Sequence, residues 1–360
     1  MKKKIAIIID NITSNAGTER AVASLCNGLL NHYEKLYKMT IISIFSDNFQ
    51  ETFFEINKQI KIVHLNHPNN FSNFSKVFWY KKMIELAREA VIENKIDILI
   101  GSSYVHNILL PIITRNSFIK TIGCEHEVYN FPPKWAKKLR KNVYLRLNQV
   151  VVLNKTEYSY YGSLSNITVI PNSLSFVSEK KSNLNKKTII AVGRLTHQKG
   201  FDVLIEIMQL VLINYPDWKL NIFGDGEDYN ILQLLIDNQN LGNNIKLCGA
   251  VKNISEQYLK SSIFALSSRW ESFGLVIIEA MNHGLPVVSF DCDGPKNIIK
   301  QGVNGFLINN FNKIEFSKKL CVLIESHETR CKFAQEAIVT SSQYEEKNIM
   351  LLWNQLIQNL

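Results

Sequence analysis

The chain has 360 residues, of which 46% are hydrophobic, and a formal net charge of +9. This length exceeds what one typical hydrophobic core serves, so we expect two domains, and the apolar content is normal for a globular protein. The first apolar run, Ile5–Ile9, is too short for an export signal and predicts a buried strand. The apolar stretch 96–114 contains an aspartate, a histidine and an asparagine, which argues against a transmembrane helix.

The excess positive charge is confined to one half of the chain. Residues 1–172 hold 22 Lys+Arg and 13 Asp+Glu, whereas residues 173–360 hold 19 of each. This asymmetry predicts an anionic partner for the first half alone. The cysteines form no CxxC pair, so we expect reduced, mostly buried thiols in a cytosolic protein. They are Cys26, Cys124, Cys248, Cys292, Cys321 and Cys331.

Strand-like apolar runs alternate with helical patterns in the first half. The expected strands are 4–9, 39–45, 98–101, 119–123, 149–153 and 168–170, and the helical patterns include 19–30 and 77–93. This βα repetition predicts a parallel sheet. Pro171-Asn172 ends the set, so the first domain is expected to span 1–172.

The pattern restarts after a polar, lysine-rich linker at 175–187. The expected strands of the second domain, 173–342, are 188–192, 219–223, 245–247, 263–266, 286–289 and 305–308. Apolar residues then share one face of a final helix at about 343–360. They are Ile349, Leu352, Trp353 and Leu356.

Glycines follow several of these strands, at Gly17, Gly193, Gly224 and Gly274. Open α/β sheets bind ligands at the carboxyl ends of their strands. Two such sheets facing each other would form a cleft.

The segment WESFGLVIIEAMNHGLP places Glu271 and Glu279 at a strand-to-helix junction. Ser272 is expected to cap the helix, and Gly274 leaves the backbone open. Three amides would then be free at the positive end of the helix dipole, which predicts a diphosphate site. These amides belong to Phe273, Gly274 and Leu275.

A diphosphate repels carboxylates, so the two glutamates are expected to contact neutral sugars. Eight helical residues rise about 12 Å, roughly the span between the sugars on either side of a diphosphate. The residues alone therefore predict a nucleotide-sugar site.

This E-x7-E element resembles the signature of the family-4 retaining glycosyltransferases, which have the GT-B fold. Other segments resemble elements of that family in the same order, and together they cover nearly the whole chain. They are SNAGTERAV (14–22), CEHEVY (124–129), VIPNSL (169–174), AVGRLTHQKGFDVLI (191–205), IFGDGED (222–228), DGPKNII (293–299) and GVNGFLI (302–308). The resemblance implies an α/β protein of two Rossmann-like domains, acceptor-side then nucleotide-sugar-binding. It also implies that the final helix packs back onto the first domain.

The resemblance assigns roles to donor-side residues. Arg194 and Lys199 match the residues that hold the diphosphate. Glu271 matches the glutamate near the transferring sugar, and Glu279 matches the one that binds the ribose hydroxyls. From the sequence alone, the two cations could equally be solvated and Glu271 an exposed loop acid. A buried carboxylate at Glu279, within LVIIEAM, would need a partner.

On the acceptor side, Gly17 matches the family glycine loop and His126 a functional histidine. A simple loop and a structural histidine are the alternatives. A metal at Glu125-His126-Glu127 is disfavoured because neighbouring side chains diverge on a strand.

No metal or cofactor is expected. Asp291-Cys292-Asp293 spells the D-x-D motif of metal-dependent transferases, but in this family Arg, Lys and amides meet the phosphates instead. The chain departs from the family at Ala16-Gly17, where two glycines are frequent, and at Lys296-Asn297, where a glutamate is frequent. These departures affect donor and acceptor recognition rather than the fold.

The expected function is transfer of a hexose or N-acetylhexosamine from a nucleotide sugar, by default UDP-linked, with retention of configuration. The expected acceptor is a glycan or lipid-diphosphate-linked glycan of a bacterial surface polysaccharide, such as lipopolysaccharide or capsule. A nucleotide-sugar epimerase and a non-catalytic glycan-binding protein are the alternatives. No nucleic-acid partner is expected, and no G-x-G-x-x-G supports a dinucleotide oxidoreductase.

The segment PPKWAKKLRKNVYLRL (132–147) combines six cations with an apolar residue every fourth position. The apolar residues are Trp135, Leu139, Val143 and Leu147. Such a helix fits an anionic membrane surface, and an ordinary helix facing a core is the alternative. The protein is therefore expected in the cytoplasm, peripheral at the inner face of the cell membrane.

Overall fold

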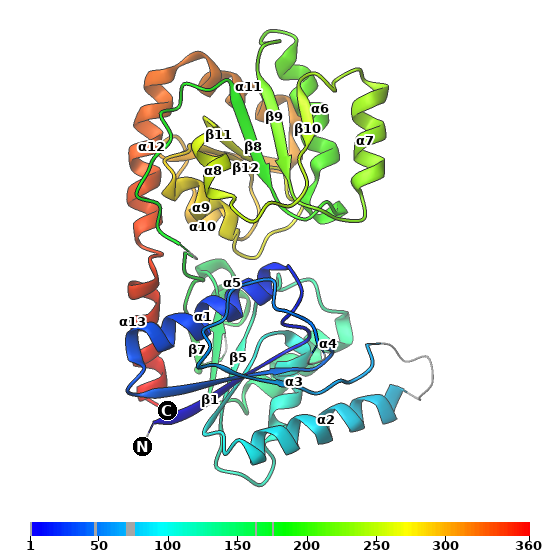
Figure 1. Cartoon of the computed structure of the whole chain (residues 1–360), viewed down its shortest axis with the longest axis vertical. Helices are drawn as coiled ribbons and strands as arrows, with labels where there is room; N and C mark the ends of the chain where they lie inside the picture. The colour runs from blue at the N-terminus through cyan, green and yellow to red at the C-terminus, as the bar shows by residue number, and fades with distance from the viewer. Residues whose placement is uncertain (1, 47–48, 70–75, 163, 175) are drawn as a thin grey trace. The chain divides into compact units, whose positions relative to one another are not determined.

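The computed structural model describes residues 2–46, 49–69, 76–162, 164–174 and 176–360. The chain divides into two compact units, each built on its own parallel sheet (Figure 1). Unit 1 comprises Met1–Ser173 and Glu346–Leu360, and unit 2 comprises Leu174–Glu345. Residue 175, the first of the expected linker, lies outside the described residues.

The sheet of unit 1 has the strand order β3-β2-β1-β4-β5-β6-β7. Its strands are β1 (Lys3–Ile9), β2 (Tyr37–Ser43), β3 (Lys61–His64), β4 (Ile98–Gly101), β5 (Lys120–Cys124), β6 (Gln149–Val152) and β7 (Ile167–Val169). In the register of the central strands, Ile5 of β1 lies opposite Met39 of β2 and Ile98 of β4. Helices cover both faces, which explains why the central strands are nearly continuous apolar runs.

The two faces of this sheet carry different helices. Ile5, Ile7 and Ile9 pack with α1 (Gly17–Tyr33) and the final helix α13 (Glu346–Gln358). Ala6 and Ile8 point the other way, because side chains alternate along a strand. They pack with α2 (Lys76–Glu93), α3 (Tyr104–Ile113) and Tyr144 of α4 (Lys134–Tyr144). The short helix α5 (Lys155–Tyr160) connects β6 to β7.

The final helix presents a slightly different face from the one predicted. Ile349, Trp353 and Leu356 are buried, as expected, but Leu352 is 39% exposed. Met350 and Ile357 are buried in its place, because α13 packs along α1 as well as towards the sheet.

The sheet of unit 2 has the strand order β10-β9-β8-β11-β12-β13. Its strands are β8 (Thr188–Val192), β9 (Lys219–Phe223), β10 (Ile245–Leu247), β11 (Ile263–Leu266), β12 (Val287–Phe290) and β13 (Gly305–Ile308). The helices are α6 (Phe201–Leu212), α7 (Tyr229–Asn238), α8 (Ser255–Leu259), α9 (Leu275–Asn282), α10 (Pro295–Ile298), α11 (Lys313–Glu325) and α12 (His327–Ser342). Two 3-10 turns, η1 (His197–Lys199) and η2 (Asn309–Phe311), lie among the described residues. Within this unit α11 packs on α6, and α12 packs on α9.

All six cysteines are free thiols, of which Cys26, Cys124 and Cys292 are buried and the other three are partly exposed. Among the described residues, no helix combines the length and the apolar character needed to cross a bilayer.

Candidate functional site

The junctions after β8 and β11 lie side by side in unit 2, because these two strands are paired in the sheet. Lys199 follows β8 and Glu271 follows β11. The Lys199 Nζ lies 2.6 Å from Glu271 Oε2, and the two side chains are only 15% and 11% exposed. The structure therefore brings together the cation and one of the carboxylates that the sequence singled out.

Local backbone geometry sets the position of Lys199. The lysine ends the 3-10 turn η1, and Gly200 follows with a φ of 63°, a left-handed conformation that favours glycine. A Cβ at Gly200 would lie 2.3 Å from the Ser267 carbonyl oxygen. The Lys199 side chain passes Gly193, where a Cβ would lie 3.2 Å from the lysine Cδ. Glycine at both positions allows the turn to approach the neighbouring loop closely.

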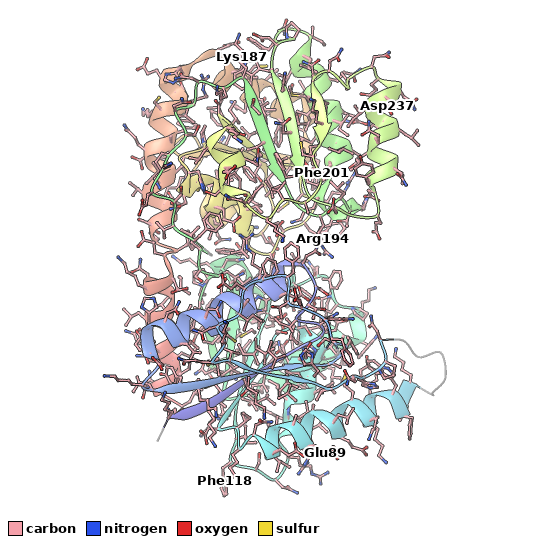
Figure 2. The ribbon with its side chains drawn as sticks, viewed as in Figure 1. Glu89, Phe118, Lys187, Arg194, Phe201 and Asp237 are labelled. Atoms are coloured by element: carbon pink, nitrogen blue, oxygen red, sulfur yellow. The ribbon has the colours of Figure 1, made fainter. Side chains whose placement is uncertain are left out.

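Arg194 lies just beyond the end of β8 and is exposed (Figure 2). Its guanidinium has neither a hydrogen-bond partner nor an ion-pair partner in the described part of the chain. An exposed guanidinium without a partner is suited to bind phosphate in a two-pronged manner.

The helix after Glu271 begins later than expected. Gly274, with a φ of 91°, is the N-cap residue of α9, so the predicted placement of Ser272 at the N-cap is wrong. The amides expected to be free find no acceptor among the described residues, and the next backbone bond runs from the Ile277 amide to the Gly274 oxygen at 2.9 Å. These amides are those of Phe273, Gly274 and Leu275. The predicted 12 Å helical rise also does not apply, because residues 271–274 are not helical.

Glu279 lies within α9 and is fully buried. Its Oε2 accepts a hydrogen bond of 3.3 Å from the Tyr258 hydroxyl of α8. Tyr258 gives this buried carboxylate one of the partners that its burial requires.

The loop that carries the D-x-D pattern is tied to Glu271. The Gly294 amide donates to the Glu271 carbonyl oxygen at 2.8 Å. A Cβ at Gly294 would lie 2.5 Å from the Phe273 carbonyl oxygen, so the close approach requires glycine. Asp293 Oδ1 pairs with Lys296 Nζ at 2.7 Å, which engages one of the two motif aspartates with a cation.

His126 belongs to unit 1, where it follows β5 and lines a pocket at the carboxyl ends of the strands. Ser102, Cys124 and Asn172 also line this pocket. Burial lowers the pKa of His126 to about 4, so the imidazole is neutral at neutral pH. It can therefore offer a hydrogen bond there but not a positive charge.

Gly17 begins α1, as predicted, but nothing within unit 1 requires glycine there. A Cβ at this position would meet no atom within 4 Å. The space beside Gly17 is therefore open to an approaching ligand.

The outer helix of unit 1, α4, differs from the prediction. Arg140, counted among its exposed cations, is fully buried, and its Nη1 lies 3.0 Å from Glu125 Oε2. Leu147 is 4% exposed and belongs to the core, and Val143 is only partly exposed. The hydrophobic periodicity predicted an apolar stripe on a free face of the helix, whereas the buried side of α4, which packs on α3, carries Ala136, Arg140 and Tyr144.

Comparison with known proteins adds to this geometry. The family model described as Glycosyl transferases group 1 matches residues 175–340. The amylovoran biosynthesis glycosyltransferase AmsD of Erwinia amylovora is 31% identical over 365 residues, covering 98% of this chain and 99% of that protein. A second relative, from Campylobacter jejuni, is 26% identical and covers 98% of each protein. It is named GalNAc-alpha-(1->4)-GalNAc-alpha-(1->3)-diNAcBac-PP-undecaprenol alpha-1,4-N-acetyl-D-galactosaminyltransferase.

A solved structure supports the fold. HepE of Anabaena, in complex with UDP-glucose, matches with a TM-score of 0.82 and 18% identity, covering 99% of this chain and 100% of that one. The expected GT-B fold, with two Rossmann-like parallel-sheet units, is confirmed.

Proposed function

This chain belongs to the group 1 glycosyltransferases, and we propose that it is a retaining enzyme of family 4 that uses a UDP-sugar. The sugar transferred is a hexose or an N-acetylhexosamine. The acceptor is a growing, lipid-linked glycan of a bacterial surface polysaccharide. Full-length similarity to a protein of amylovoran biosynthesis and to a transferase acting on an undecaprenol-linked glycan supports this acceptor class. The UDP-glucose complex of the HepE neighbour supports the donor class.

The observation that carries the proposal is the Lys199–Glu271 pair beside the open amides of α9. In the reaction, the bond between the sugar C1 and the phosphate oxygen breaks. A bond from C1 to the acceptor oxygen forms on the same face, and the acceptor proton passes to the leaving phosphate. Lys199, Arg194 and the helix amides offset the charge that develops on the diphosphate. Glu271 accepts hydrogen bonds from the sugar hydroxyls and orients the sugar.

The first experiment is a donor panel. The purified protein is incubated with UDP-, GDP- and dTDP-linked hexoses and N-acetylhexosamines, and release of the nucleoside diphosphate is measured. We expect slow release of UDP from one or a few UDP-sugars without added acceptor. Conversion to an epimeric nucleotide sugar without UDP release would overturn the proposal.

We further propose that unit 1 docks on an anionic membrane through the outer face of α4. The structure exposes Trp135 (64%) and Leu139 (41%) on one edge of this helix. Exposed Lys134, Lys138 and Lys141 lie on the adjoining edge. Cations beside an apolar edge fit an anionic lipid surface, at about 1 kcal/mol for each cation.

Flotation with vesicles of graded anionic lipid content tests this docking. Binding should rise with anionic lipid, fall with salt, and weaken when Lys134, Lys138 and Lys141 are changed to glutamate. A matched control changes three exposed lysines elsewhere on unit 1 to glutamate, with the same effect on net charge. These are Lys81, Lys82 and Lys95. Equal recovery with neutral and anionic vesicles would rule out electrostatic docking and leave the transferase assignment intact.

A further inference from the structure

Arg269 and Asp202 form a two-pronged ion pair that links the loop after β11 to the first turn of α6. Arg269 Nη1 donates to Asp202 Oδ1 at 2.9 Å, and Nη2 donates to Asp202 Oδ2 at 2.6 Å. The side chains are 22% and 43% exposed. The planar guanidinium matches a carboxylate in this arrangement, which gives the contact a defined geometry as well as attraction.

The same loop holds each residue of the 3-10 turn η1. Arg269 Nη1 also donates to the His197 carbonyl oxygen at 2.7 Å. The Arg269 amide donates to the Gln198 carbonyl oxygen at 2.8 Å. The Ser267 hydroxyl donates to the Lys199 carbonyl oxygen at 2.9 Å. Three consecutive carbonyl groups of the turn are thus bonded to one short stretch of the neighbouring loop.

The turn ends at Lys199, and the loop leads within two residues to Glu271. A displacement of the turn would therefore move the ammonium relative to its carboxylate. A lysine side chain loses rotamer freedom when it is fixed, so a site that holds it in advance binds an anion more tightly. Arg269 itself is committed to Asp202 and His197, which leaves it a supporting role.

Burial of Asp202 opposes its ionisation, but the hydrogen bonds and the charge of Arg269 outweigh this effect and lower the pKa of Asp202. The pair therefore stays charged across the neutral range.

We infer that Asp202 and Arg269 are positioning residues of the donor site, holding η1 so that the Lys199 ammonium stays beside Glu271, ready for the diphosphate. This inference rests on the proposed function, in which Lys199 binds the donor diphosphate. It extends the site to two residues that do not touch the substrate.

The test is a double-mutant cycle on the dissociation constant of UDP, measured by calorimetry for the wild type, Asp202→Asn, Lys199→Ala and the double variant. Asp202→Asn should weaken UDP binding about tenfold in the wild-type background, within the range of coupling between residues in one network. It should have almost no effect once Lys199 is alanine, because there is no ammonium left to position. Arg269→Lys keeps the charge but loses the two-pronged contact, and should fall between wild type and Asp202→Asn.

Glu206→Gln is the matched control, since it removes another exposed ion-pairing acid of α6, the partner of Lys313 at 2.6 Å. It should leave UDP affinity unchanged, and melting temperatures should show that every variant is folded. An equal effect of Asp202→Asn in both backgrounds would overturn the inference, because it would indicate a general structural role. If Lys199→Ala weakens binding and Asp202→Asn does not, the inference also fails while the proposed donor role stands. If Lys199→Ala leaves UDP affinity unchanged, the inference and the proposed donor role of Lys199 both fail.

Discussion

Lys199 and Glu271 form an ion pair in a mostly buried position. Removing either side chain leaves the charge of the other without its partner. We expect both Lys199→Ala and Glu271→Ala to lower kcat, because the charge on the diphosphate develops in the transition state. Lys199→Ala should also weaken UDP binding, because released UDP keeps the charge that the ammonium meets. A loss of about 2–4 kcal/mol of transition-state stabilisation corresponds to a decrease in kcat of roughly 30- to 800-fold. Steady-state kinetics with the donor found in the panel measures this. Full activity in a folded variant of either residue would contradict the assignment.

Glu279 should behave differently, because the ribose contact proposed for it is the same in the ground and transition states. We expect Glu279→Gln to weaken UDP binding and change kcat less. Tyr258→Phe is the control, since it removes only the hydroxyl that donates to Glu279 at 3.3 Å. Calorimetric titration with UDP gives the affinities. A Glu279→Gln variant with unchanged UDP affinity and a large fall in kcat would reverse the two roles.

Glu127, in the loop after β5, makes unit 1 sensitive to pH. Burial, followed by the charges of Glu125 and Asp10, raises its pKa to about 7, and Arg140 works against that rise. Its Oε2 is buried without a hydrogen-bond partner in the described part of the chain. Because the folded pKa lies above the ordinary value of 4.5, the folded state holds the proton more tightly. The contribution of Glu127 to stability should be fully present below about pH 4.5 and should be lost as pH rises towards 7.

A glutamine at position 127 cannot ionise, so the Glu127→Gln variant isolates the effect of this ionisation on stability. The variant should be more stable than wild type at pH 8, by up to about 3 kcal/mol, and the difference should nearly vanish at pH 4.5. Urea unfolding at the two pH values is the measurement. A difference that does not depend on pH would show that Glu127 ionises normally.

At the scale of elements, α4 shows which features the hydrophobic periodicity of a sequence does not predict. Its helical character and its cations could be predicted, but the burial of Arg140 could not. The partner of Arg140 is Glu125, 15 residues away and just after β5, so the pairing depends on tertiary packing rather than on a local sequence pattern. The edge strand β3 was also missed, because Lys61–His64 is short and only partly buried. Weakly buried edge strands carry little apolar signal.

The buried pair predicts a large stability difference between two adjacent cations of α4. Arg140→Met leaves Glu125 buried without its cation and should cost about 3–5 kcal/mol of unfolding free energy. Lys141→Met changes an exposed residue and should stay within about 0.5 kcal/mol of wild type. Urea denaturation of both variants is the measurement. Equal stabilities would mean that the Glu125–Arg140 contact contributes nothing.

Some features of the donor side could be predicted from the sequence, and others could not. Lys199, Glu271 and the open amides before α9 could be predicted, because each follows a strand in a recognisable segment. The Asp202–Arg269 pair could not, since its members are 67 residues apart and resemble ordinary surface charges. The helix start at Gly274 was also missed, because Ser272 is an equally good capping residue by type.

At the scale of the whole molecule, the charge of the donor is expected to be met by protein groups alone. We propose that Arg194, Lys199 and the α9 amides take the role that Mg²⁺ plays in other transferases. Activity should therefore survive excess EDTA, and Asp291→Asn should remain active. Loss of turnover in EDTA that Mg²⁺ or Mn²⁺ restores would show instead that the aspartates of the D-x-D pattern hold a metal.

Retention of configuration is the most direct test of the central claim. The protein is incubated in EDTA with α-linked UDP-hexoses and UDP-N-acetylhexosamines, and proton NMR records the free sugar before its anomers equilibrate. The account predicts release of UDP and first formation of the α-anomer, with both signals strongly reduced for Lys199→Ala. First formation of the β-anomer, or no UDP release from any donor of the panel, would contradict it.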